Sequence, residues 1–179
     1  MDRPHIRSAT AGDVHAIAAL HLASWRTAYR GIVPDAFLNG VTIDSRIERW
    51  TRAVTAPAVQ RVTTLVATSE QAVIGVSSFG PGRDHESSGE IYALHVLPGH
   101  TRRGVGAALF NQSTRMLRHM GFASVTLWVL RDNQAARLFY EAMGWSLSGR
   151  ARLETHHGYE IPEVEYAARF NTPASAAPG

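Results

Sequence analysis

Hydrophobic and polar residues follow two periods along this chain, one typical of helices and one typical of strands. From Val14 to Tyr29, apolar side chains recur every three or four residues, which predicts one long helix with Thr10 as its N-cap. The next segment, 30–41, contains glycine and proline, which predict a break in the helix. Three further helices are expected, over 43–54, about 104–119 and 133–144.

Short runs rich in β-branched and aromatic residues predict strands. The two runs on either side of Ser69, Glu70 and Gln71 are close enough to form a hairpin, and the run 123–130 is apolar throughout, as in a strand covered on both faces. Together the patterns predict one domain of the α/β (α+β) class with a mixed sheet, and a disordered tail over 171–179. The expected strands are 5–10, 61–68, 72–80, 90–97, 123–130, 145–154 and 160–170.

Composition narrows the classes of protein that this chain can belong to. With 179 residues, 45% of them hydrophobic and 18% charged, the chain can bury a sizeable core. It has no cysteine, which excludes disulfides, a thiolate nucleophile and zinc–thiolate sites. No apolar run is long enough to span a membrane and the N-terminus lacks the pattern of a signal peptide, so we expect a cytoplasmic protein with no membrane partner.

All 18 basic residues are arginine, and the absence of lysine excludes two further kinds of site. A P-loop needs a lysine that reaches the phosphates, and Schiff-base chemistry needs a lysine amine. The net charge is only +3, and the arginines are scattered apart from the pair Arg102–Arg103. We therefore expect no nucleic-acid partner, since such proteins gather their basic residues in a patch or stripe.

The stretch HTRRGVGAAL, residues 100–109, places two glycines at the start of a predicted helix. One interpretation is a dinucleotide site of the Rossmann type, but Leu109 stands where the third glycine belongs. A second is a helix start without a ligand. A third is a diphosphate cradle made of backbone amides, with the helix dipole behind it and Arg102 and Arg103 beside it. Other segments must decide between the second and the third.

Two segments in order, EIYALHVLPGHTRRGVGAAL (90–109) and NQAARLFYEAMGW (133–145), resemble the GNAT superfamily of acetyl-CoA-dependent N-acetyltransferases. The first resembles that family's strand, pyrophosphate loop and helix, and the second its next helix. Thr101 stands where the family's pattern has arginine or glutamine, so no side-chain role is expected for it. The resemblance implies a single-domain GNAT fold, with about seven strands and four helices over 1–170, and an acetyl-CoA-dependent transfer to a primary amine.

The resemblance also implies which residues bind the cosubstrate. The backbone around Leu94 to Val96 would pair with the pantetheine arm as an additional strand would, and the loop before the helix would hold the diphosphate. Asn133 has a competing interpretation as a helix N-cap, and both roles are compatible. The positions implied to bind acetyl-CoA are Leu94, His95, Val96, Arg102, Arg103, Gly104, Val105, Gly106, Ala107, Asn133 and Ala136.

The expected reaction needs a base and an acid. Only about one part in a thousand of an aliphatic amine is neutral at pH 7, and the neutral form attacks the thioester. Glu90 lies as far from the glycine loop as the catalytic glutamate of the family's histone-acetylating branch, which implies a base. Tyr140 shares a helix face with Asn133 and Ala136, which implies an acid for the leaving thiolate. The alternatives, a packing tyrosine and a solvated glutamate, stay open.

The acceptor side carries the weakest sequence signal. Trp25 and Tyr29 resemble the part of GNAT proteins that covers the acceptor pocket, although both residues could simply pack the helix on the sheet. The pair His156–His157 is not expected to bind a metal, because adjacent strand residues point to opposite faces. We expect a small-molecule or peptide amine as acceptor and leave a homodimer open. The alternative functions are a non-catalytic acyl-CoA-binding module and, as a third, a nucleic-acid-binding domain.

Overall fold

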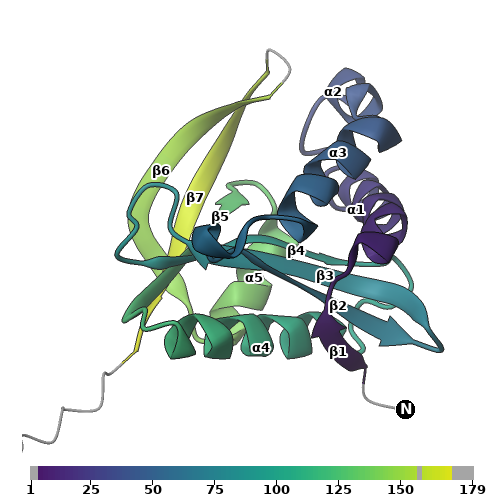
Figure 1. The fold of residues 1–179 in the computed structure, drawn as a ribbon. Helices are drawn as coiled ribbons and strands as arrows, with labels where there is room; N and C mark the ends of the chain where they lie inside the picture. Colours follow the sequence, from purple (N-terminus) through teal and green to yellow (C-terminus); the bar gives the residue numbers. More distant parts are fainter. Residues whose placement is uncertain (1–3, 157–158, 171–179) are drawn as a thin grey trace, which may run out of the picture.

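The computed structural model describes residues 4–156 and 159–170 and contains one seven-stranded mixed sheet (Figure 1). The strand order is β1-β2-β3-β4-β5-β7-β6, and every neighbouring pair is antiparallel except β4 and β5, which are parallel. This confirms the predicted fold class and the hairpin, which is β2 and β3. The strands are β1 His5–Ser8, β2 Thr63–Ser69, β3 Ala72–Pro81, β4 Gly89–Val96, β5 Ser124–Leu130, β6 Ser146–His156 and β7 Tyr159–Arg169.

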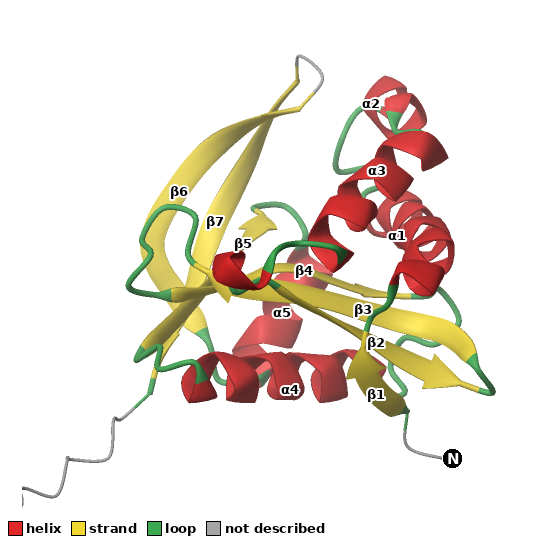
Figure 2. Cartoon of the chain, in the orientation of Figure 1, coloured by secondary structure: helices red, strands yellow, loops and turns green. Residues whose placement is uncertain are grey.

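Five α-helices cover the two faces of the sheet (Figure 2). Helices α1 and α3 pack on β2, β3 and β4 from one side, whereas α4 packs on β2, β3 and β4 from the other, in a shared core with α5. None of the described helices has the length and apolar character needed to cross a bilayer. The helices are α1 Val14–Ala28, α2 Asp35–Gly40, α3 Ile43–Val54, α4 Val105–His119 and α5 Gln134–Ala142.

The helix starts follow the capping chemistry of the sequence, with one difference. The amide and the hydroxyl of Thr10 donate hydrogen bonds to Asp13 Oδ2 at 2.8 and 2.9 Å, but Thr10 precedes a 3₁₀ turn that leads into α1. Asn133 Oδ1 accepts a hydrogen bond from the amide of Ala136 at 3.2 Å, so Asn133 is the N-cap of α5. The segment 30–41, expected to be irregular, contains α2, which starts after Pro34.

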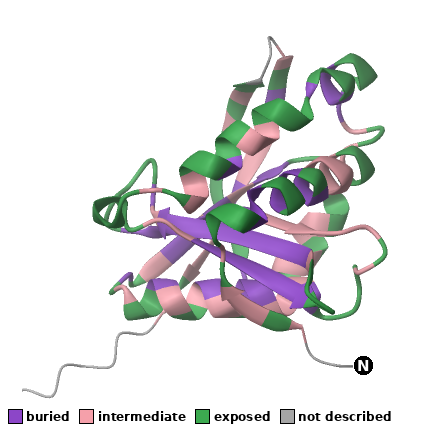
Figure 3. Cartoon of the chain, turned by 45° about the vertical axis from the view of Figure 1, so that its right-hand side comes forward, coloured by how far each residue is buried: buried purple, intermediate pink, exposed green. Residues whose placement is uncertain are grey.

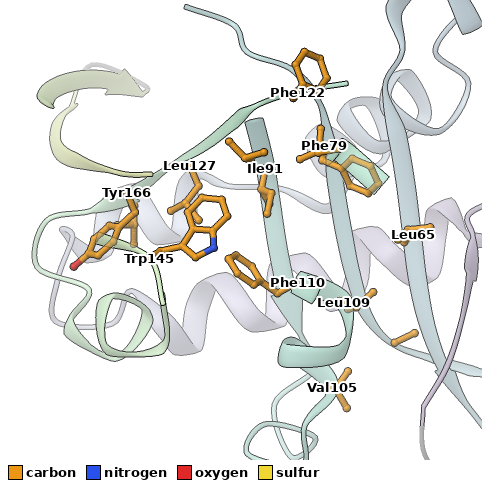
Figure 4. Close-up of a cluster of buried hydrophobic side chains, with 14 of the residues drawn as sticks. Leu65, Phe79, Ile91, Val105, Leu109, Phe110, Phe122, Leu127, Trp145 and Tyr166 are labelled. Carbon is orange, nitrogen blue, oxygen red and sulfur yellow. The ribbon is translucent and has the colours of Figure 1, made fainter. Parts of the chain in front are cut away.

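The sheet separates two hydrophobic clusters because successive strand residues point to opposite faces. On β2, Leu65 and Ala67 pack toward α4 and α5, whereas Val66 between them packs toward α1 and α3. The central strands are therefore buried on both faces (Figure 3). In the cluster on the α4 side, the rings of Phe110 and Trp145 lie with centroids 5.0 Å apart (Figure 4).

A third and smaller cluster joins α2 to the far end of the sheet. Phe37 and Leu38 of α2 pack against Leu130 at the end of β5 and Ile161 on β7. The helix that the sequence did not indicate therefore connects the first part of the chain to the hairpin of β6 and β7. Phe37, Leu130 and Ile161 also line a cavity beside this cluster.

Candidate active site

The two parallel strands of the sheet separate in its middle. Strands β4 and β5 pair only between Gly89–Ile91 and Val125–Leu127, whereas β4 continues to pair with β3 as far as Val96. The edge of β4 that faces β5 therefore has no strand partner over 92–96. An extended ligand can hydrogen-bond to such an edge as an additional strand would.

A cavity of about 490 Å³ opens where these strands separate. Leu94 and His95 of β4 line it on one side, and Trp128–Leu130 of β5 line it on the other. Its wall also includes Tyr140 of α5, together with residues of α1, α3, β6 and β7. The cavity thus joins the two faces of the sheet through the gap between β4 and β5.

The glycine loop, residues 100–104, leads into α4, and the second glycine, Gly106, lies in the first turn of this helix. Gly104 has a φ of +80°, a left-handed conformation that glycine adopts without strain. The first amide to donate within the helix is that of Ala108, to the carbonyl oxygen of Gly104 at 2.9 Å, so the three amides of 105–107 have no partner in the helix. A Cβ on Gly106 would lie 3.5 Å from Val96 Cγ2, an ordinary contact. The fold alone therefore does not require glycine at 106.

Tyr140 contributes a hydroxyl group to the cavity wall. Its ring packs against Phe139 and Phe110, with centroids 5.4 and 5.6 Å away, which fixes the direction of the side chain. Within the described part of the chain, the hydroxyl group has no hydrogen-bond partner. Burial, with a smaller effect of Tyr29, raises the pKa of Tyr140 above its ordinary value. The phenol therefore keeps its proton at neutral pH and can donate it to a ligand.

Glu90 lies behind the cavity wall. It is only 2% exposed, and it is not among the residues that line the cavity. One carboxylate oxygen accepts a hydrogen bond from the Arg83 amide at 2.9 Å, and the other accepts from Arg83 Nε at 2.9 Å and also from its terminal nitrogen. Arg83 therefore stands between Glu90 and the cavity, which Arg83 itself lines.

Two histidines stack beside the gap between the strands. The rings of His21 on α1 and His95 on β4 lie 4.0 Å apart at 23°. Trp50 Nε1 donates a hydrogen bond to His21 Nδ1 at 2.9 Å, so a neutral His21 carries its proton on Nε2. Burial, and then the charges of Arg49 and Arg46, lower the pKa of His95 to about 3, and burial lowers that of His21 too. Both rings are therefore neutral at physiological pH.

Aromatic residues from α1 and α2 form the wall farther from the gap. Trp25 lies 4.4 Å from Tyr29 and 5.7 Å from Phe37 between ring centroids, and all three line the cavity. Burial, with a smaller effect of Glu163, raises the pKa of Tyr29 to about 12. This wall is apolar apart from the Tyr29 hydroxyl group and the Trp25 indole N–H.

Arginines dominate the charge of the remaining wall. Arg46, Arg49 and Arg52 of α3 line the cavity with Arg83 and Arg152, whereas only two acidic residues, Glu154 and Glu163, do so. Asp84 and Glu86 of the loop 82–88 are not part of the lining, and Asp84 lies 3.5 Å from a terminal nitrogen of Arg150. No group of three His, Asp or Glu side chains in 4–156 and 159–170 is placed to hold a metal ion.

Residues 24–145 match the Acetyltransferase (GNAT) family. The chain belongs to the GNAT acetyltransferase family. The N-acetyltransferase YuaI of Bacillus subtilis (strain 168), itself uncharacterised, is 34% identical over 140 residues, which cover 76% of this chain and 77% of YuaI. Relatives of this kind are named N-acetyltransferases, and the protein is a GNAT-type acyltransferase.

Solved structures of GNAT proteins share the fold. The PaiA N-acetyltransferase of Thermoplasma acidophilum, solved with coenzyme A, has a TM-score of 0.71 at 16% identity and covers 94% of this chain and 100% of its own. The YncA protein of Salmonella typhimurium, solved with acetyl-CoA, has a TM-score of 0.71 at 18% identity and covers 97% and 98%. These likenesses confirm the predicted GNAT fold, with five helices where four were expected.

The structure brings seven of the fifteen predicted site residues of this GNAT protein to the cavity. The predicted residues on the cavity wall are Trp25, Tyr29, Leu94, His95, Asn133, Ala136 and Tyr140. Val96 and the loop from Arg102 to Ala107 lie outside the lining, and so does Glu90. The roles of all these residues stay predictions. His156 and His157, predicted not to bind a metal, have side chains outside the described part of the structure.

Sequence reasoning missed the basic wall of the cavity. The arginines looked scattered because they come from α3, the loop 82–88 and β6, which are far apart in the chain. One signal was present, since Arg46 and Arg49 are three residues apart and share a face of the predicted helix. No signal of this kind existed for His21 and His95, which only the packing of α1 on β4 brings together.

Proposed function

We propose that this protein transfers an acetyl group from acetyl-CoA to a primary amine, directly within a ternary complex. The observation that carries the proposal is the single cavity that runs from the unpaired edge of β4 and Tyr140 to the aromatic and basic wall on the other side of the sheet. A donor thioester and an acceptor amine can meet there without a covalent enzyme intermediate. The chain has no cysteine to form a thioester intermediate of its own.

Backbone groups would bind the cosubstrate in this proposal. The free edge around Leu94 to Val96 would pair with the pantetheine arm, and the amides of 105–107 would hold the diphosphate, with Arg102 and Arg103 beside them. Asn133 and Ala136 would border the same ligand from α5. Acetyl-CoA supplies an activated acyl group whose leaving thiolate, by analogy with cysteine, has a pKa of about 8.5.

Tyr140 would act as the general acid. Its hydroxyl group is protonated at neutral pH, and its packing against Phe110 and Phe139 holds that group at the cavity. Because burial raises the pKa, the phenol is a weak acid that gives up its proton only as negative charge develops on the departing sulfur. Donation of this proton to the departing sulfur would make departure easier. An amide near Val96 would stabilise the negative charge that develops on the carbonyl oxygen.

Two residues compete for the role of the base. Glu90 is the predicted base, and its position behind Arg83 would require a water molecule, or a movement of Arg83, to connect it with the amine. His95 lines the cavity and is neutral, so it can accept a proton, although a pKa of about 3 makes it a weak base in the free protein. We retain Glu90 as the base and treat His95 as the alternative.

An assay of thiol release tests the proposed function. Purified protein is mixed with acetyl-CoA and a panel of small amines, amino acids and peptides, and free coenzyme A is followed with a thiol reagent. We expect amine-dependent release that Tyr140→Phe reduces while the melting temperature stays unchanged. Tight binding of acetyl-CoA with no release for any amine would instead support a non-catalytic acyl-CoA-binding module.

A further inference from the structure

We infer that the acceptor amine carries a carboxylate a few bonds from its nitrogen, and that Arg46 and Arg49 bind this carboxylate. The inference rests on the proposed function and names the substrate class of the same site. It excludes plain alkylamines and polyamines as preferred acceptors.

Arg46 and Arg49 differ from the other arginines of the cavity because they have no anionic partner. Arg152 pairs with Glu163 at 2.8 Å, Arg52 pairs with Glu48 at 2.6 Å, and Arg83 pairs with Glu90. In the part of the chain that the structure describes, neither the guanidinium group of Arg46 nor that of Arg49 makes a hydrogen bond or ion pair. The two acidic residues of the wall therefore do not neutralise them.

Arg46 is half-buried, and one nitrogen of its guanidinium group is enclosed by the protein. This nitrogen, Nε, has no hydrogen-bond acceptor, and the guanidinium group lies 5.1 Å from the centre of the Trp25 ring. Burial, and then the charge of Arg49, lower the pKa of Arg46 to about 10. An unpaired charge in such a position is unfavourable, and an anion that enters the cavity relieves it.

Arg49 adds a second cation on the same face of α3. It is open to the cavity, but the surrounding protein, and then the charges of Arg83 and Arg52, lower its pKa. Two guanidinium groups side by side offer planar, paired N–H donors that match the geometry of a carboxylate. The two arginines therefore form an anion-binding site that no carboxylate of the described residues occupies.

Arg46 and Arg49 line the cavity from α3, on the same side of the sheet as α1. Their charges contribute to the lowered pKa of His95, which lies on β4 next to Leu94 at the separated strands. The expected diphosphate loop, in contrast, leads into α4 on the opposite face of the sheet (Figure 1). Arg46 and Arg49 are thus placed to bind the acceptor rather than the phosphates of coenzyme A.

A further feature of the wall bears on the body of the acceptor. The rings of Trp25, Tyr29 and Phe37 provide an apolar surface for the body of the substrate. An amino acid with an apolar side chain combines these properties within a cavity of about 490 Å³.

Matched acceptors test the inference by their kcat/KM values. The panel contains phenylalanine, its amide, phenethylamine and the aminophosphonic acid analogue of phenylalanine. We expect phenylalanine to be acetylated with a kcat/KM at least tenfold above those of the amide and phenethylamine. A preference for either neutral amine, or for the phosphonate, would overturn the inference and leave the proposed function intact.

Variants of Arg49 connect the preference to the arginines. Arg49→Gln should abolish the preference for phenylalanine by raising its KM about tenfold, with the KM for acetyl-CoA unchanged, and Arg49→Lys should restore part of it. Arg115→Gln, an exposed change on α4 outside the cavity, is the charge-matched control and should keep the parent preference. A preference that survives Arg49→Gln, or a weaker affinity for acetyl-CoA in this variant, would contradict the assignment.

Calorimetry keeps the inference testable if no amine turns over. Phenylalanine is titrated into the parent protein and into Arg49→Gln, each saturated with coenzyme A. We expect measurable binding by the parent and about tenfold weaker binding by the variant. No binding by the parent, or equal binding by both, would overturn the carboxylate site, whereas failure of turnover alone would overturn only the proposed function.

Discussion

The two ends of the cavity are built in different ways. The proposed acetyl-CoA site begins at the free edge of β4 on the cavity wall and continues, outside the cavity lining, to the first turn of α4, so it consists mainly of backbone groups from one continuous stretch. The end assigned to the acceptor consists of side chains from α1, α2, α3, β6 and β7. Backbone groups can hold a ligand whatever the side chains are, whereas the choice of one substrate depends on the side chains that contact it.

Mutations at the two ends should therefore have different effects. At the cosubstrate end, a change matters when it alters the space or direction of the backbone. At the acceptor end, a change should alter the choice of substrate without altering the affinity for acetyl-CoA.

Glu90→Gln should have the largest effect if Glu90 accepts the proton from the amine. General-base help is worth about 10²-fold at the low end, so kcat should fall about 100-fold and the acidic limb of the pH–rate profile should change. The affinity for acetyl-CoA should stay within about twofold. If only the melting temperature falls, Glu90 merely anchors Arg83, and the base is His95 or water.

Tyr140→Phe removes one hydroxyl group and keeps the ring that packs on Phe110 and Phe139. We predict a fall in kcat of roughly 10- to 100-fold, because a thiolate is already a fair leaving group and needs less help than the general range allows. Steady-state kinetics should show the KM for acetyl-CoA nearly unchanged. A higher KM with unchanged kcat would mean that the hydroxyl group only binds the cosubstrate.

Gly106→Ala and Gly104→Ala should separate two reasons for glycine in the loop. A Cβ at 106 fits the free protein, at 3.5 Å from Val96, so this variant should keep its melting temperature while acetyl-CoA binds about tenfold more weakly in calorimetry. Gly104 has a φ of +80°, where a side chain costs roughly 1–2 kcal/mol, so its variant should lose stability. Unchanged affinity in Gly106→Ala would reduce the loop to a simple helix start.

The buried histidine pair should make stability depend on pH. The unfolded chain binds protons at His21 and His95 below the ordinary histidine pKa of 6.5, whereas folded His95 does so only near pH 3. Stability should therefore fall as the pH decreases below about 6.5, by up to about 1.4 kcal/mol per pH unit for each histidine. Denaturant unfolding at pH 7.5, 6 and 5 measures this slope. His119→Gln on the exposed end of α4 should keep the slope, and a flat profile would contradict the buried, neutral pair.

Sequence patterns predicted most of the fold because its elements follow local rules. The segment expected as a helix over 43–54 coincides with α3, where Thr42 Oγ1 accepts a hydrogen bond from the amide of Ser45. Helix α2 was missed because the glycines and the proline of the segment 30–41 indicate a break. Its packing on Leu130 and Ile161, which are distant in sequence, stabilises a helix too short to be stable by itself.

The parts of the candidate site that come from one segment of sequence were predicted, and most parts that distant segments bring together were not. The resemblance to the GNAT superfamily implied a role for the glycine loop and for the face with Asn133, Ala136 and Tyr140, and the structure places this face on the cavity wall. The contact of Arg83 with Glu90 and the gathering of arginines depend on distant segments. Apart from the spacing of Arg46 and Arg49, no local pattern encodes these contacts. The basic wall was therefore not predicted, whereas Trp25 and Tyr29 on the aromatic wall were.

Two-substrate kinetics test the central claim, that donor and acceptor meet in one cavity and react directly. Initial rates are measured over a matrix of acetyl-CoA and acceptor concentrations, with the best amine of the panel. We predict intersecting lines in double-reciprocal plots and no release of coenzyme A in the absence of amine. Parallel lines, with a burst of coenzyme A before amine is added, would show a covalent acyl-enzyme and contradict the account.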